Sequence, residues 1–136
     1  MKRLVLFFAS WTSGAIAYFT TLFLAFDEVP ASLSGDFAAV LFWSILCYAL
    51  SYVVLYLPLL RAVHRGLGGV RPWWPFPLLA VIAGAVPTAL IAFFNGGGMR
   101  GLFGAEAVLF HVMFAAVGIV LGVGYVLVHR SDPASG

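Results

Sequence analysis

Four long runs of apolar residues, separated by short polar segments, dominate this chain. The runs cover residues 4–26, 37–60, 76–94 and 105–128, and none contains aspartate, glutamate, lysine or arginine except Glu106, at the start of the fourth. At a rise of about 1.5 Å per residue, helices of these lengths reach about 28–36 Å, against about 30 Å for the hydrocarbon core of a bilayer. The pattern therefore predicts four transmembrane helices joined by short loops.

The composition excludes the common soluble classes. The 136 residues are 63% hydrophobic and 9% charged, whereas an average soluble domain is about half apolar and about a quarter charged. A water-soluble domain of this size has too little interior to cover so much apolar surface. We therefore expect an all-α integral membrane protein, with a single domain over residues 1–136 built as an up-down bundle of four transmembrane helices.

The charged residues and the cysteine remove further classes. A net charge of +2 gives no basic footprint for nucleic acid. The single cysteine, Cys47, excludes an intramolecular disulfide and a cysteine-based metal site. No nucleophile, base and orienting acid can be assembled from the sequence. We therefore expect no metal, no cofactor and no catalytic residue, and a lipid bilayer as the main partner.

The first run has a competing interpretation as a signal peptide. Lys2 and Arg3 precede an apolar stretch, and residues 15–17 (Ala-Ile-Ala) resemble a small-residue cleavage site. However, the apolar run continues through residues 18–26 with no polar region after the alanines. We therefore expect an uncleaved first transmembrane helix.

Lysine and arginine are distributed unevenly between the two sides of the predicted bundle. Six belong to the N-terminus, the second loop or the C-terminus, and one belongs to the third loop: Lys2, Arg3, Arg61, Arg65, Arg71 and Arg130 against Arg100. Cytoplasmic loops carry the excess of these residues, so we expect both termini and the second loop in the cytoplasm. The strong preference for arginine over lysine, with abundant alanine, glycine and valine, is typical of GC-rich bacterial genomes and favours the bacterial inner membrane.

Several residues near helix ends refine this picture. Trp73 and Trp74 predict an aromatic anchor at the cytoplasmic interface. Pro87 predicts a kink in the third helix because its nitrogen cannot donate the usual backbone hydrogen bond. His64 and His129 lie at cytoplasmic helix ends, where we expect them to be solvated.

Small residues recur at helical spacing within the runs. Because lipid is as apolar as leucine, helices in a bilayer associate through the close approach of small residues and through interhelical hydrogen bonds. We expect contacts between helices at four glycines, Gly14, Gly84, Gly118 and Gly122. Gly118 and Gly122 form a small-xxx-small pair, a pattern that also occurs at dimer seams, and this alternative stays open.

Polar side chains gather at one depth of the predicted bundle. Four of them lie six or seven residues from the outer end of their helix, about 9–10 Å below the boundary, and two others are close by. The predicted layer comprises His111, Ser44, Tyr48, Thr88, Thr20 and Thr21. Unpaired polar groups are costly in hydrocarbon, so we expect His111 to point into the bundle and to bond one of these side chains or a backbone carbonyl. The layer is either a ligand site or a structural device that fixes helix register.

The sequence favours a non-catalytic function. We expect a small polytopic protein that is not an enzyme and that acts through intramembrane helix contacts, as a subunit or accessory of a larger membrane complex or as a homo-oligomer. The alternative is an oligomeric transporter or channel with the polar layer around His111 lining its path. A third interpretation is a membrane enzyme, or a protein that binds lipid or quinone, that uses His111.

Overall fold

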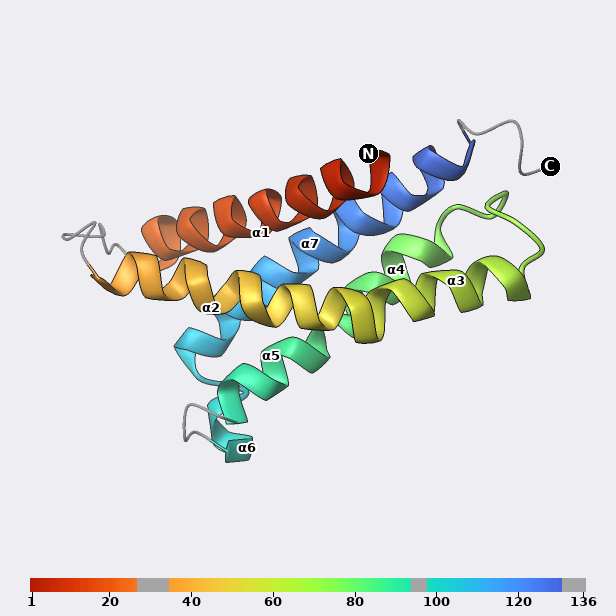
Figure 1. Ribbon diagram of the computed structural model, residues 1–136. Coiled ribbons are helices and arrows are strands. Elements are labelled where there is room, and N and C mark those ends of the chain that lie inside the picture. Colours follow the sequence, from red (N-terminus) through yellow and green to blue (C-terminus); the bar gives the residue numbers. More distant parts are fainter. Residues whose placement is uncertain (27–34, 94–97, 131–136) are drawn as a thin grey trace.

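All regular secondary structure in the described part of the chain is helical. The computed structural model describes residues 1–26, 35–93 and 98–130. The elements are α1 (Lys2–Phe26), α2 (Gly35–Ser51), η1 (Tyr52–Tyr56), α3 (Leu57–Gly66), α4 (Pro75–Ala83), α5 (Ala85–Ala92), α6 (Gly98–Gly101) and α7 (Ala105–Arg130). The segments α2, η1 and α3 form one continuous long helix, and α4 and α5 are the two halves of another (Figure 1).

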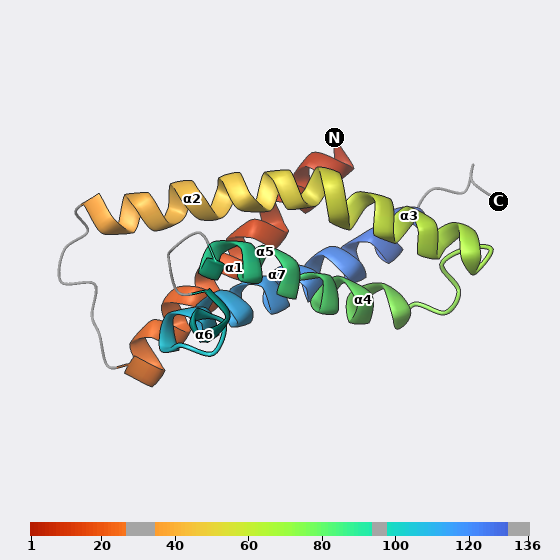
Figure 2. The same cartoon turned by 90° about the horizontal axis from the view of Figure 1, so that it is seen from below.

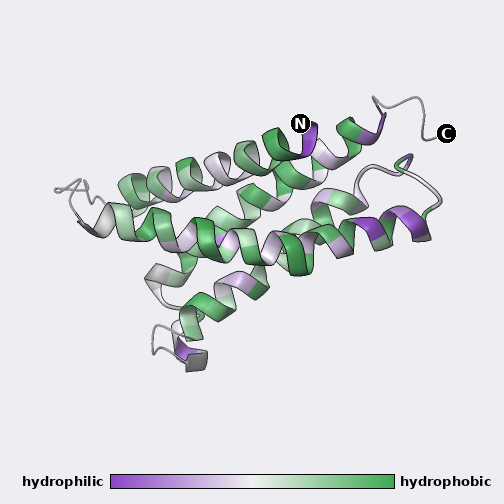
Figure 3. Ribbon diagram, in the orientation of Figure 1, coloured by the Kyte–Doolittle hydropathy of each residue, from purple (hydrophilic) through white to green (hydrophobic). Residues whose placement is uncertain are grey.

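Four helical units are long and apolar enough to cross a membrane. They cover Lys2–Ala25, Ala38–Gly66, Pro75–Ala92 and Ala107–Arg130. Apolar residues cover most of their length, and hydrophilic residues gather toward the ends of the units (Figure 3). The prediction of an all-α, multi-pass membrane protein is therefore confirmed. The acidic residues Asp27 and Glu28 and the glycines of the third loop before Gly98 lie outside the described residues.

The helices alternate in direction along the chain. The N-terminus, the connection between α3 and α4, and the last turn of α7 lie at the same end of the molecule (Figure 1). We call this end, which holds Lys2, Gly66 and Arg130, the basic end. The long α2–η1–α3 unit runs along one side of the other helices (Figure 1, Figure 2).

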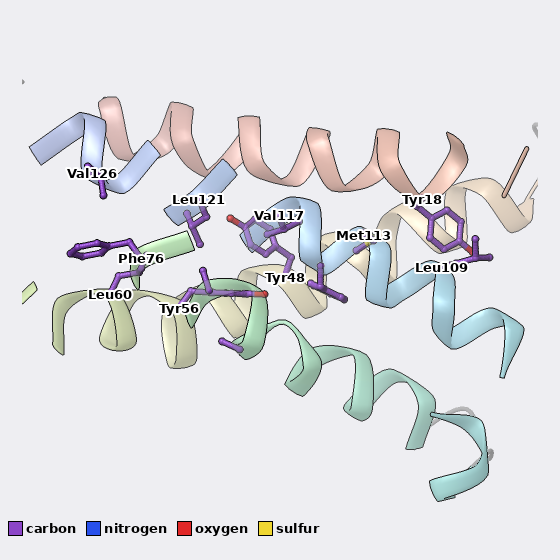
Figure 4. Packing of buried hydrophobic residues seen from close by; sticks show 13 residues of the cluster. Tyr18, Tyr48, Tyr56, Leu60, Phe76, Leu109, Met113, Val117, Leu121 and Val126 are labelled. Atoms are coloured by element: carbon purple, nitrogen blue, oxygen red, sulfur yellow. The ribbon is translucent and has the colours of Figure 1, made fainter. Parts of the chain in front are cut away.

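The helix α7 lies at the centre of the packing. It has its most extensive contacts with α1 and α4, and weaker contacts with α5. It supplies the largest share of the buried apolar cluster, namely Leu109, Met113, Phe114, Val117, Leu121 and Val126. Side chains from the facing helices, including Tyr48, Tyr56 and Phe76, complete this cluster (Figure 4).

The second unit contains one wide turn. In η1 the hydrogen bonds follow π-helix spacing, and the amide of Leu57 donates to the carbonyl of Tyr52. Pro58 lies in the first turn of α3. Proline has no N–H to donate, and its ring clashes with the carbonyl four residues earlier, so a regular α-helical turn cannot be continued here. The wide turn accommodates this clash without breaking the helix.

The same property of proline breaks the third unit. The helix is interrupted at Gly84, between α4 and α5, three residues before Pro87. The amide of Gly84 bonds the carbonyls of both Ala80 and Val81, and the bond from Thr88 to the Gly84 carbonyl is long, at 3.4 Å. The kink expected from Pro87 is therefore present, one turn toward the N-terminus.

The second unit also extends further than the apolar run predicts. The run ends at Leu60, but α3 continues to Gly66. Arg61 and Arg65 are exposed there, while Leu60 is buried and Val63 is half-buried. The last turns are amphipathic, with apolar side chains on one face only. The mean hydropathy of such a segment is therefore low, and the segment does not appear as part of an apolar run. The predicted boundary was therefore too early.

The four predicted glycines lie against backbone or side chains of neighbouring helices. A Cβ atom built at Gly118 would lie 2.7 Å from the carbonyl carbon of Ala80 and from the amide nitrogen of Val81. One at Gly122 would overlap Pro77. Equivalent atoms at Gly14 and Gly84 would approach α7, the latter 3.0 Å from the Phe114 carbonyl oxygen. The pair in α7 therefore contacts α4 of the same chain.

We expect Gly118→Ala to lower the free energy of unfolding in mild detergent by about 1–3 kcal/mol. The added methyl group would press on the backbone of α4, which cannot yield without moving the helix. Thermal and denaturant unfolding of the purified protein measures the change. Gly66→Ala is the matched control because a Cβ atom there meets nothing within 4 Å. Equal losses for both variants would contradict the packing.

Candidate functional site

The structure does not bring the predicted polar layer together. His111 is exposed on the surface of α7, and its Nε2 lies 3.4 Å from the carbonyl oxygen of Leu102. The expectation that His111 points into the bundle is therefore wrong, although the ring does approach a backbone carbonyl.

The kink in the third unit explains this difference. His111 follows the same helical spacing as Gly118, and Gly118 contacts α4. At the level of His111, however, the facing segment is α5, which diverges from α7 beyond the break at Gly84 (Figure 1). The contacts of α7 with α5 are correspondingly weaker than those with α4. The face that packs near Gly118 is therefore uncovered one to two turns earlier.

Ser44 and Tyr48 instead join α2 to α1. Both are buried, and the Tyr48 hydroxyl lies 2.6 Å from Ser10 Oγ. Ser10 Oγ also lies 2.8 Å from the Leu6 carbonyl. A carbonyl only accepts, so the Ser10 hydroxyl donates to Leu6 and the Tyr48 hydroxyl donates to Ser10. One turn away, Trp11 Nε1 donates to Ser44 Oγ at 3.3 Å.

The threonines of the predicted layer make no interhelical bond among those that the structure describes. Thr88 is buried and donates to the Gly84 carbonyl of its own helix at 3.0 Å. Thr21 donates to the Ala17 carbonyl at 2.8 Å, and Thr20 is exposed. The hydroxyls of Thr88 and Thr21 are satisfied by their own helix backbone, as is common for threonine in helices. The six residues of the layer thus do not surround a common cavity.

One buried hydroxyl is left without a partner. Tyr56, in η1, has no exposed surface, and no hydrogen-bond partner for its Oη lies among the described residues. Its ring packs against that of Tyr48, with centroids 6.2 Å apart. Burying such a group in hydrocarbon costs free energy, and the π turn that carries Tyr56 departs from regular helix geometry at the same point.

A cleft at the basic end brings together charged and hydrogen-bonding side chains from different helices. Three helical units contribute to it: α1, the η1–α3 segment and α7. The cleft is narrow, with an enclosed space of about 20 Å³, which is room for about one water molecule. Its charged or polar lining residues are Arg3, Tyr52, Arg61, Tyr125 and His129, and its apolar lining includes Leu6, Leu57, Leu60 and Leu121.

An aromatic stack forms one side of this cleft. The rings of Tyr125 and His129 are stacked with centroids 4.0 Å apart, and the Phe76 ring also stacks on that of Tyr125, with centroids 5.6 Å apart. His129 Nδ1 donates to the Tyr125 carbonyl at 2.8 Å, and the Tyr125 hydroxyl lies 3.4 Å from His64 Nδ1. Both histidines are half-buried, so each keeps part of the solvent exposure expected of it while contacting Tyr125. The four-residue spacing of Tyr125 and His129 was the available signal.

Comparison with known proteins leaves the function to be argued from this geometry. No family model, curated protein or solved structure matches the chain.

We expect the Tyr48–Ser10 bond to appear as coupling in a double-mutant cycle. Tyr48→Phe and Ser10→Ala each remove one partner of the 2.6 Å contact, and interhelical hydrogen bonds in membranes couple by about 0.6 kcal/mol on average and about 1.7 kcal/mol at most. Unfolding of the single and double variants in detergent measures the coupling free energy. The control pairs Tyr48→Phe with Ser13→Ala, because Ser13 bonds only the Ser10 carbonyl of its own helix. Coupling as large in the control cycle would contradict a direct bond.

Proposed function

We propose that this protein is a non-enzymatic, multi-pass protein of the bacterial inner membrane that serves as a subunit or accessory of a membrane complex. Its contacts with partners, or with further copies of itself, are made by its helices inside the bilayer. The observation that carries the proposal is the use of the buried polar side chains. Ser10, Ser44, Tyr48 and Thr88 bond other helices or their own backbone, so they serve packing rather than a reaction.

Two further features support the proposal. The transporter alternative required His111 to line a polar path, but His111 is exposed on the surface of α7. Large apolar side chains on the outer faces of all four units are available for lipid or for other membrane helices. Among them, Ile16 on α1, Leu50 on α2 and Ile119 on α7 are exposed by 62%, 64% and 52%.

The orientation is part of the proposal. The N-terminus, the last turn of α7 and the α3–α4 connection belong to the basic end, and most lysine and arginine residues of the chain belong to these segments. Positive residues are retained on the cytoplasmic side during insertion. We therefore assign the basic end to the cytoplasm.

Cysteine labelling tests the orientation. In a Cys47→Ser background, Leu67→Cys reports the basic end and Phe103→Cys reports the opposite end, since both positions are exposed. We expect a membrane-impermeant maleimide applied to intact spheroplasts to label position 103 and not position 67. Permeabilisation should then make position 67 reactive. Labelling of position 67 alone in intact spheroplasts would reverse the assignment.

Copurification tests the proposed mode of action. We expect native mass spectrometry in mild detergent to detect a second membrane protein or a second copy of the chain at defined stoichiometry. Tryptophan at Ile16, Leu50 or Ile119 should weaken this association at one face or more while leaving thermal stability unchanged, because each side chain is exposed in the isolated chain. Association that is unaffected at all three faces, or a stoichiometric haem, quinone or metal in its place, would contradict the proposal.

A further inference from the structure

The cleft at the basic end lies at the depth of lipid headgroups. Arg3 is the second residue of α1 and His129 is the last but one of α7. Arg61 precedes the end of α3 by five residues, which is about 7–8 Å along the helix. Trp73 and Trp74, in the α3–α4 connection at the same end, are more than half exposed, as is typical of residues at a membrane interface. The mouth of the cleft is therefore interfacial.

The mouth carries positive charge with no acidic partner in the described part of the chain. Arg3 and Arg61 come from different helices, are exposed, and both lie within electrostatic reach of the hydroxyls of Tyr52 and Tyr125. The described helices carry acidic residues only in the first turns of α2 and α7, at the opposite end of the molecule. Asp132 lies outside the described residues. Two guanidinium groups converging on one cleft favour an anion there.

The remaining polar groups refine the chemistry of that anion. His129 Nδ1 donates to the carbonyl of Tyr125, so in the neutral ring the remaining nitrogen, Nε2, is an acceptor and supplies no donor for an anion. Tyr52 also lines the cleft, and a phenol hydroxyl can donate a hydrogen bond to an anion. The permanent positive charge is therefore supplied by Arg3 and Arg61, whose planar guanidinium groups match the oxygens of a phosphate.

Below the mouth the cleft is apolar. Leu6 of α1 and Leu57 of α3 are half-buried and form its accessible wall, whereas Leu60 and Leu121 are each only 1% exposed and lie in the buried cluster. A free phosphate ion makes no favourable contact with an apolar wall. A phospholipid, in contrast, carries a charged phosphate at the membrane surface and an apolar acyl chain below it, in the same order as the arginines and leucines of the cleft. Basic pockets between transmembrane helices near the membrane surface suit anionic lipid headgroups.

We propose that this cleft binds an anionic phospholipid, with its phosphate held between Arg3 and Arg61 and an acyl chain against the leucine wall. The site stands on the contacts of the cleft alone and does not depend on the proposed function. It assigns a ligand class to residues of which only the basic ones entered the sequence analysis, as markers of orientation.

Lipid titration of the full-length protein in mild detergent tests the site. The probes are dioleoyl phosphatidylglycerol, dioleoyl phosphatidylcholine and soluble glycerol phosphate, with bound lipid counted by native mass spectrometry and stabilisation followed by thermal unfolding. We expect one tightly bound phosphatidylglycerol and a raised melting temperature with that lipid. Phosphatidylcholine should bind more weakly, and glycerol phosphate at the same phosphate concentration should not stabilise the protein.

Matched variants separate the cleft from general surface charge. Arg61→Gln should weaken phosphatidylglycerol binding about fivefold, and the Arg3→Gln, Arg61→Gln double variant about 25-fold. Arg65→Gln is the control for longer-range charge, since Arg65 acts electrostatically on the Tyr125 hydroxyl but is exposed one turn further along α3 and does not line the cleft. It should change the affinity by less than about twofold. Unchanged melting temperatures in phosphatidylcholine verify that the variants fold.

Three outcomes would overturn the proposal. An Arg65→Gln loss as large as that of Arg61→Gln would show that binding is diffuse attraction to the basic end. Phosphatidylcholine binding as tight as phosphatidylglycerol binding would show that the phosphate charge is not recognised. Equal stabilisation by glycerol phosphate would assign the cleft to a free anion instead of a lipid.

Discussion

The close approach of α7 to α4 is the constraint on which the rest of the bundle depends. Gly118 and Gly122 allow the backbone of α7 to lie directly against Ala80, Val81 and Pro77. In a bilayer no hydrophobic driving force brings helices together, so packing of this kind and a few hydrogen bonds must supply the association free energy. Because α7 also packs along α1, the two contacts fix three of the four units around one helix.

The fourth unit, α2–η1–α3, is attached by a different means. Its contacts with α4, α5 and α1 are all sparse, but those with α1 include the hydrogen bonds from Tyr48 to Ser10 and from Trp11 to Ser44. In hydrocarbon no water competes for these groups, and leaving any of them unpaired is costly. The bonds therefore specify which face of α2 meets α1, a choice that leucine and valine side chains alone would leave open.

Much of the fold, but little of the cleft, is predictable from the sequence. The apolar runs identify the four spans because hydropathy and length are local properties. The exposure of His111, in contrast, depends on the path of another helix. Its helical spacing places it with Gly118, but the break at Gly84 removes the facing helix at its level. The stack of Tyr125 on His129 was readable from their spacing, whereas its meeting with His64 depends on how α3 and α7 pack.

The π turn in η1 sets the direction in which the residues of α3 point relative to those of α2, and so places both a core residue and a residue of the cleft. In a regular α-helix, with about 100° per residue, residue 60 would lie about 120° away from the direction of Tyr48. The extra residue in a π turn reduces this angle by about 100°. Leu60 therefore faces the core on the same side as Tyr48, and both side chains are buried. The same shift leaves Arg61 at the edge of the buried face, on the rim of the cleft. Pro58, which prevents a regular turn, thus determines where the positive charge of α3 is placed.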